Sequence, residues 1–129
     1  MTAGQLENYV TRLLGENGWW ALRIPRNPSG AQPFDIIAVK GSKVLALDCK
    51  ACFERKFPIK RVEDNQWTAF ATMAKRTDAI VGIVAENEGL LYFISYAELL
   101  NAKGSYLGLT DERLLRWLNV SNSQGRYFS

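Results

Sequence analysis

The sequence contains no histidine among its 129 residues. Histidine is the usual general base of Ser-His-Asp and Cys-His catalysis and a frequent ligand of metal ions. Its absence excludes both kinds of catalysis, histidine metal sites and hydrolases that rely on an imidazole base. Any catalytic chemistry must therefore use carboxylates, lysine, serine, tyrosine or cysteine.

Cysteine is also scarce, and the only two, Cys49 and Cys52, form a C-x-x-C motif. A zinc site needs more cysteine or histidine ligands than the chain offers. A redox pair needs its first cysteine at a helix N-terminus, whereas Cys49 lies at the end of a predicted strand. We therefore favour two reduced structural cysteines over redox chemistry.

Long apolar runs are missing as well. No run approaches the roughly 20 residues that span a bilayer. The N-terminal stretch MTAGQLENYV lacks the basic segment and apolar core of a signal peptide. Together with the sparse cysteines, these features lead us to expect a cytoplasmic protein with no membrane partner.

The residues that are present have an ordinary globular composition, with 47% hydrophobic and 22% charged residues. The length fits one domain, which we place at residues 1–118, followed by a polar, flexible tail at 119–129. The net charge of +3 favours an anionic partner only weakly, so the distribution of charge matters more.

Apolar periodicity predicts an α/β chain. Helices are expected at about 3–16, 62–76, 95–102 and 111–118. Strands are expected at about 19–24, 36–39, 44–47, 80–85 and 90–94. Because 80–85 is almost wholly apolar, it is typical of a central strand that is covered on both faces.

The stretch PFDIIAVKGSKVLALDCK predicts a β-hairpin that gathers charge at one end. The start of one antiparallel strand lies beside the end of the other, so Asp35 and Asp48 should be neighbours. Alternation along the strand puts Asp48 and Lys50 on one face, about 7 Å apart, and Cys49 on the other. Two carboxylates and a lysine in one place indicate a catalytic site.

Two further polar residues lie on or beside apolar helix faces. Glu7 flanks the apolar stripe of the first helix, where a solvated edge position is the simpler interpretation. Gln66 falls within the apolar stripe of the second helix, where an unpartnered side chain would cost about 1–3 kcal/mol. It should either cap a strand end or reach the carboxylates.

Basic residues gather in two loop regions on either side of the hairpin. The Pro- and Gly-rich loop 25–33 suits phosphate contact, although a plain surface loop is an equal alternative. Residues 50–61 interleave basic side chains with two phenylalanines, a pattern of nucleic-acid binding that a solvated charged face also explains. The candidate DNA-binding residues are Arg23, Arg26, Ser29, Arg55, Lys56, Lys60 and Arg61.

The order Glu7, Asp35, Asp48-x-Lys50 and Gln66 on this series of elements resembles the PD-(D/E)xK nuclease superfamily. Within it, GQLENYV, RIPRNPSGAQPFDIIAVK and LALDCKA are similar to archaeal Holliday junction resolvases. FERKFPIKRVEDNQWTAF, AIVGIVAE and LLYFISYAELL are similar to the RecU type of Gram-positive bacteria and phages. The resemblance covers about residues 4–100 and departs from the common pattern at Phe34 and at Asp48, where glutamate is common.

The resemblance implies a fold and a metal site. The expected fold is a restriction-endonuclease-like core, a central mixed β-sheet flanked by helices in the order α-β-β-β-α-β-β-α. The expected cofactor is Mg²⁺, with Mn²⁺ as a substitute, held by Glu7, Asp35, Asp48 and the backbone carbonyl of Cys49. Lys50 would orient the attacking water or stabilise the phosphorane, and Gln66 would position either one.

The activity implied is that of a homodimeric endonuclease that hydrolyses phosphodiester bonds in branched DNA at four-way junctions. Two alternatives stay open: another nuclease of the superfamily, of the repair or restriction-like kind, and a catalytically silent DNA-binding module. The intact acid set favours an enzyme, because a module that only binds DNA gains nothing from carboxylates near phosphates.

A homodimer is expected because a four-way junction is two-fold symmetric and one chain has a single candidate site. We interpret several late apolar residues as surplus material for the interface between subunits. The alternative is that they close the chain's own core. They are Leu91, Phe93, Tyr106, Leu107, Leu109 and Trp117.

Overall fold

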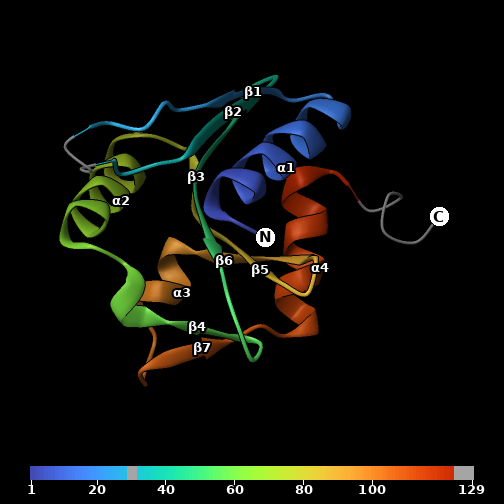
Figure 1. Cartoon of the computed structure of the whole chain (residues 1–129). Helices are drawn as coiled ribbons and strands as arrows, with labels where there is room; N and C mark the ends of the chain where they lie inside the picture. Colours follow the sequence, from blue (N-terminus) through green and yellow to red (C-terminus); the bar gives the residue numbers. More distant parts are fainter. Residues whose placement is uncertain (29–31, 124–129) are drawn as a thin grey trace.

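A computed structural model of the chain describes residues 1–28 and 32–123, with a mixed five-stranded sheet at its centre (Figure 1). The strand order is β1-β2-β3-β5-β6. Only β3 and β5 run parallel, and the other neighbours are antiparallel. The strands are β1 (Trp20–Arg23), β2 (Ile36–Lys40), β3 (Lys43–Ala51), β5 (Ile80–Asn87) and β6 (Leu90–Ser95).

Helices cover both faces of this sheet. The helices α1 (Ala3–Glu16) and α4 (Asp111–Ser121) pack on one face, and α2 (Asp64–Arg76) and α3 (Tyr96–Leu100) pack on the other. The helix α2 also supplies the crossover that the parallel pair β3–β5 needs. Alternation along β3 therefore directs Leu45, Leu47 and Cys49 towards α1, and Ala46 towards α2.

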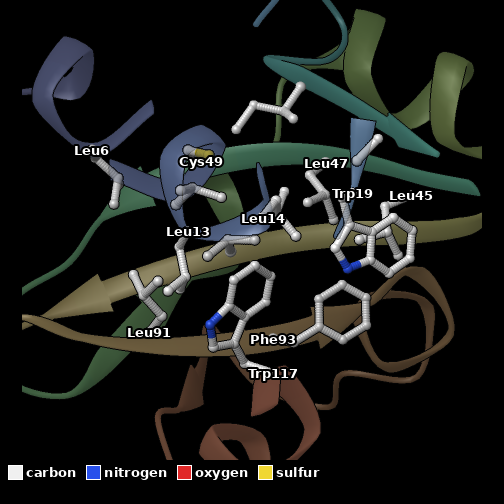
Figure 2. Close-up of a cluster of buried hydrophobic side chains, with 14 of the residues drawn as sticks. Leu6, Leu13, Leu14, Trp19, Leu45, Leu47, Cys49, Leu91, Phe93 and Trp117 are labelled. Carbon is white, nitrogen blue, oxygen red and sulfur yellow. The ribbon is translucent and has the colours of Figure 1, made fainter. Parts of the chain in front are cut away.

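The larger apolar cluster lies between α1, the sheet and α4 (Figure 2). The stripe of α1 buries Leu6, Val10, Leu13 and Leu14, as its helical spacing predicts. Thr2 caps the start of the helix, and its side chain accepts a hydrogen bond from the backbone of Gln5 in a reciprocal capping box. This packing fixes α1 against β3 and so determines where the side chains of its first turns point.

A second sheet has two strands, β4 (Lys56–Pro58) and β7 (Tyr106–Gly108). A 3₁₀ turn, η1 (Ile59–Arg61), follows β4 directly. The sequence did not predict these short strands. The second helix accordingly starts at Asp64 and not at Val62, because Val62 is extended and buried. The rest of the expected order of helices and strands is confirmed.

The C-terminal boundary expected after residue 118 lies too early. The helix α4 continues to Ser121, and both Ser121 and Ser123 are buried. The indole nitrogen of Trp19 donates to the Ser121 carbonyl at 3.0 Å, which joins the end of α4 to the start of β1. Residues 119–123 therefore belong to the packed domain, and 124–129 lie outside the described residues.

The interpretation of the late apolar residues as interface material is wrong for most of them. Leu91, Phe93, Leu109 and Trp117 are at most 3% exposed and belong to the chain's own core. Leu107 is half-buried, and only Tyr106 is exposed, at 51%. The four buried residues belong to the two apolar clusters that cover the faces of the central sheet.

None of the described helices has the length and apolar character that crossing a membrane requires.

Candidate active site

The predicted meeting of Asp35 and Asp48 is confirmed. Ile36 pairs with Leu47 across the β2–β3 hairpin, so the two aspartates lie next to each other at its open end. The backbone N–H of Asp35 donates to the Leu47 carbonyl at 2.9 Å. Its carboxylate accepts the Cys49 N–H at 2.8 Å, which holds the side chain across β3.

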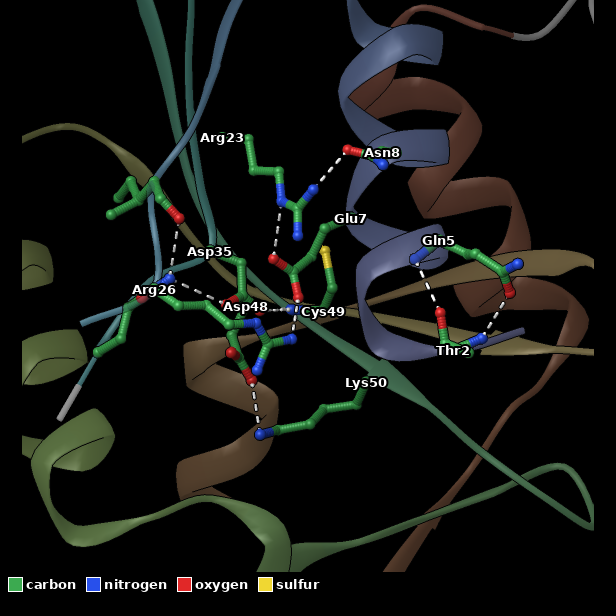
Figure 3. A network of polar contacts seen from close by, with 12 residues as sticks. Thr2, Gln5, Glu7, Asn8, Arg23, Arg26, Asp35, Asp48, Cys49 and Lys50 are labelled. Carbon is green, nitrogen blue, oxygen red and sulfur yellow. Dashed lines mark hydrogen bonds and ion pairs between the residues drawn. The ribbon is translucent and has the colours of Figure 1, made fainter. Parts of the chain in front are cut away.

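Asp48 is 2% exposed, and its Oδ2 has no hydrogen-bond partner among the described residues. The Lys50 ammonium lies 3.2 Å from this oxygen as an ion pair outside hydrogen-bond geometry (Figure 3). Burial raises the pKa of Asp48 to about 8, and the adjacent Asp35 carboxylate adds to the rise, while the charge of Lys50 opposes it. The positive charge of Lys50 alone therefore does not offset the burial of the Asp48 carboxylate and the repulsion from Asp35.

A cleft of about 430 Å³ opens beside these residues. Its lining includes every residue that the sequence nominated as catalytic: Glu7, Asp35, Asp48, Lys50 and Gln66. Elements far apart in the chain supply them, with α1, the β2–β3 hairpin and α2 each contributing a wall. One end of the sheet therefore gathers the whole predicted set.

Glu7 reaches this cleft but is engaged by arginines (Figure 3). It is 2% exposed, and its two oxygens lie 3.1 Å from Arg23 Nε and 3.0 Å from Arg26 Nη2. Within the described ranges, no three acidic or cysteine side chains form a group that could hold a metal ion. Glu7 thus lies in the same cleft as Asp35 and Asp48, but its carboxylate pairs with Arg23 and Arg26 and does not form a three-carboxylate group with the two aspartates.

Gln66 is 3% exposed and lies in the cleft wall. Its side-chain oxygen accepts the backbone N–H of Glu63 at 3.1 Å, so it closes the first turn of α2. Of the two alternatives given for Gln66, the strand cap is not found, because the residue caps its own helix. This cap also fixes the Gln66 side chain at the edge of the carboxylate site.

Of the remaining predicted DNA-binding residues, one lines the cleft, three lie outside its lining and one lies outside the described residues. Arg61 lines the cleft and donates to the Ala51 carbonyl at 2.6 Å. Three others lie outside the cleft lining on residues 55–60, which we call the β4 segment and which comprise the turn before β4, β4 itself and the start of η1: Arg55, Lys56 and Lys60. Ser29 lies outside the described residues.

Both cysteines are free and buried. Burial raises the pKa of the Cys49 thiol well above its ordinary value, and the nearby carboxylates act in the same direction. Burial likewise raises the pKa of Cys52 to about 11. Both side chains are therefore neutral thiols, which supports the structural interpretation over the redox one.

Two residues in the cleft wall were missed from sequence. The amide nitrogen of Gln32 lies 3.4 Å from Asp35 Oδ1 and 3.2 Å from the Ile24 carbonyl, so it ties the arginine-rich loop to the site. Its place three residues before Asp35 was the available signal. Phe53 lines the cleft beyond Lys50 and was noted only as part of a basic segment.

Comparisons with known proteins agree with this geometry. Residues 3–113 match the model of a family described as archaeal Holliday junction resolvase (Hjc). Two curated relatives are both named crossover junction endodeoxyribonuclease Hje. The one from Saccharolobus solfataricus is 32% identical over 68 residues, covering 52% of this chain and 50% of the relative. The one from Sulfolobus acidocaldarius is 38% identical over 55 residues, covering 42% and 40%.

A solved structure shares the fold. The Archaeoglobus fulgidus protein Hjc, a Holliday junction resolvase from an archaeal hyperthermophile, superimposes with a TM-score of 0.66 at 15% identity. The match covers 93% of this chain and 95% of that one. The chain spans about half the length or less of the curated relatives it matches. Because the family model matches far more than half of the residues, the chain belongs to the archaeal Holliday junction resolvase family of the PD-(D/E)xK nucleases.

Proposed function

We propose that this chain is a divalent-metal-dependent endonuclease that hydrolyses phosphodiester bonds of four-way DNA junctions. The observation that supports this most is the Asp35–Asp48–Lys50 group, in which a buried carboxylate oxygen lacks a hydrogen-bond partner among the described residues. Such an arrangement is unfavourable for the protein alone and becomes favourable when a cation shares the site.

The residues present fit a hard divalent cation. Asp35 and Asp48 would bind it directly, and the backbone carbonyl of Cys49 and the Glu7 carboxylate would complete an all-oxygen set. Oxygen donors without imidazole suit Mg²⁺, with Mn²⁺ as a substitute. When bound, such an ion polarises the scissile phosphate and lowers the pKa of a water molecule, which supplies a nucleophile without an imidazole base.

The chain's own side chains then have distinct roles. Lys50, whose ammonium lies 3.2 Å from Asp48 Oδ2, would orient the attacking water and offset the charge that develops on the phosphorane. Gln66, fixed by its helix cap, would position Lys50 or the water. Arg23 and Arg26 would release Glu7 when the anionic DNA backbone arrives, since a phosphate competes with a carboxylate for guanidinium groups.

DNA would be held from two sides of the cleft. Arg23 and Arg26, with Ser29 of the same loop, would contact phosphates beside Glu7, and Arg61 would contact them from the opposite wall. Arg55, Lys56 and Lys60 on the β4 segment would hold a more distant stretch of backbone. A protein acting on branched DNA works where the DNA lies, so we place it in the cytoplasm.

A homodimer would supply the second site that paired cleavage needs. The late apolar residues no longer support this, but an exposed sheet face does. Trp20 and Leu22 on the edge strand β1 are 63% and 46% exposed. The strand register puts half-buried Val39 beside Trp20 and Ile37 beside Leu22. Two copies of this apolar face would bury each other's exposed side chains.

The deciding experiment is cleavage of an end-labelled four-way junction with Mg²⁺, with EDTA and with Ca²⁺, alongside linear duplex of the same sequence. We expect paired symmetric cuts near the branch point with Mg²⁺ and none with EDTA. Equal cutting of the linear duplex would indicate another nuclease of the superfamily. Junction binding with no cutting under any metal would indicate a DNA-binding module.

A further inference from the structure

Phe53 is unusual for its place at the cleft. Among the described large apolar side chains it has the highest exposed fraction, 81%. It lines the cleft that holds Asp48 and Lys50, and it follows Lys50 by about 10 Å along the chain. A single exposed apolar residue needs no explanation by itself. What needs an explanation is the strained backbone turn that directly follows Phe53.

Phe53 opens a two-residue turn between β3 and β4. The backbone N–H of Lys56 donates to the Phe53 carbonyl at 3.2 Å and closes the turn. The two central residues, Glu54 and Arg55, have φ values of 58° and 55°. Turns of this kind normally use asparagine or glycine, because other side chains are strained in the left-handed region. The chain therefore keeps a strained turn directly after an exposed phenyl ring.

The same turn is anchored on both sides. The Arg55 N–H donates to the buried Asn87 side chain at 3.2 Å, and the Leu109 N–H donates to the Arg55 carbonyl at 2.8 Å. Just before the turn, the Cys52 N–H donates to the Glu86 carbonyl at 2.7 Å. These bonds tie the turn to the end of β5 and to the segment after β7. The backbone that carries the phenyl ring is thus held in a fixed place, while the ring itself is exposed and contributes little to the core.

We propose that Phe53 is a specificity residue that stacks on a nucleobase at the branch point of the DNA, an inference that rests on the proposed function. In a continuous duplex each base is covered by its neighbours, whereas the end of a stack is open where strands exchange. An aromatic ring can stack on any such exposed base, whatever its sequence. A phenyl ring about 10 Å beyond Lys50 along an extended chain would reach a base about three stacked nucleotides from the cleaved bond.

The test compares equilibrium binding to a four-way junction and to a linear duplex of the same sequence, with Ca²⁺ replacing Mg²⁺. Phe53→Ala should weaken junction binding about tenfold, equal to about 1.4 kcal/mol, and change duplex binding less than about twofold. Phe53→Trp should restore junction binding because it keeps an aromatic face. Phe53→Leu should not restore it, because it keeps apolar bulk without the ring.

Leu115→Ala is the matched control, since Leu115 is an exposed apolar residue, at 52%, on α4 and outside the cleft lining. It should leave the ratio of junction to duplex affinity unchanged. The inference is overturned if Phe53→Ala keeps the wild-type ratio, or if Phe53→Leu restores it. A shift to monomer in light scattering of Phe53→Ala would instead make the ring a contact between chains.

Failure of the proposed function would look different. In that case the wild-type chain itself would bind the junction and the duplex equally, and the role of Phe53 would fall with it. A wild-type preference that survives Phe53→Ala would overturn only the stacking role.

Discussion

At the scale of single residues, the buried Asp48 is the group in the site whose pKa is raised most among the carboxylates described. Burial and the neighbouring Asp35 raise its pKa to about 8, so the ionised form needs added positive charge. We predict that Asp48→Asn or Asp35→Asn abolishes cleavage, because each removes a proposed metal ligand, and leaves DNA binding intact or tighter, because an amide cannot ionise and so cannot repel phosphate. Single-turnover cleavage and equilibrium binding on the same junction test this. Wild-type cleavage by either variant would refute the site.

Lys50 and Lys56 each follow an acidic residue by two positions, but we predict that they affect different steps: Lys50 the cleavage rate and Lys56 DNA binding. Lys50 is 15% exposed and pairs with Asp48, whereas Lys56 is 45% exposed and lies 4.7 Å from the centre of the Tyr106 ring. Lys50→Ala should lower the single-turnover rate by at least about 100-fold, as loss of an electrostatic stabiliser does. Lys56→Ala should weaken binding and reduce its salt slope by about 1. A reversed pattern would exchange their roles.

At the scale of elements, the close approach of β5 and β6 depends on Gly82. A Cβ atom at this position would lie 2.2 Å from the Ile94 carbonyl oxygen and 2.8 Å from the Phe93 ring. We predict that Gly82→Ala lowers the free energy of unfolding by about 3 kcal/mol or more, because backbone must move to admit the methyl group. Chemical denaturation measures the loss.

Gly15→Ala is the control for this change, since it adds the same atom within α1, where no atom lies within 4 Å of the new Cβ. It should raise stability by about 0.5–1 kcal/mol through helix propensity. Equal effects at Gly82 and Gly15 would mean that the β5–β6 contact is looser than described.

The order of the main elements could be predicted because it depends on local periodicity. The hairpin of β2 and β3 brought Asp35, Asp48 and Lys50 together through pairing of segments that adjoin in sequence. The strands β4 and β7 could not be predicted, because three-residue strands leave no periodic signal and their partners lie about 50 residues apart. The end of α4 was missed for a similar reason, since it depends on Trp19.

The sequence could predict which residues lie in the candidate site, but not which of them form ion pairs with one another. Helical spacing placed Glu7 beside the apolar stripe, and strand alternation placed Lys50 beside Asp48. No local pattern could show that Arg23 and Arg26 both reach Glu7, because that contact depends on how β1 and the loop after it pack against α1. Fixed side-chain partners across elements are a tertiary property.

At the scale of the whole molecule, Glu98 links α3 to α4 at the end of the domain. Its carboxylate lies 2.9 Å from Arg113 and 2.5 Å from Arg116 and accepts the Ser95 N–H at 3.1 Å. Burial acts to raise the pKa of Glu98, but the Arg116 hydrogen bond, the Ser95 N–H and the arginine charges together lower it. A lowered carboxyl pKa contributes stability above the unfolded value of about 4.3.

We therefore predict that Glu98→Gln lowers the free energy of unfolding at pH 7 by about 1–2 kcal/mol. The difference from wild type should shrink as the pH falls below about 4, through the lowered pKa of the folded state. Glu112→Gln is the control, because Glu112 also pairs with Arg116 but is 73% exposed and should contribute less than about 0.5 kcal/mol. A difference independent of pH would contradict the assignment.

Both faces of the strand β3 have a role, one in the core and one in the cleft, and this restricts insertions and deletions within the strand. One face packs Leu45, Leu47 and Cys49 against α1, and the other presents Asp48 and Lys50 to the cleft. A single codon inserted in β3 upstream of Leu47 would shift the residues that follow by one position, turning Asp48 towards the apolar core and Leu47 towards the cleft. Functional descendants should therefore tolerate many substitutions in β3 but no change in its length. Variation in length should accumulate instead in exposed segments such as 103–105.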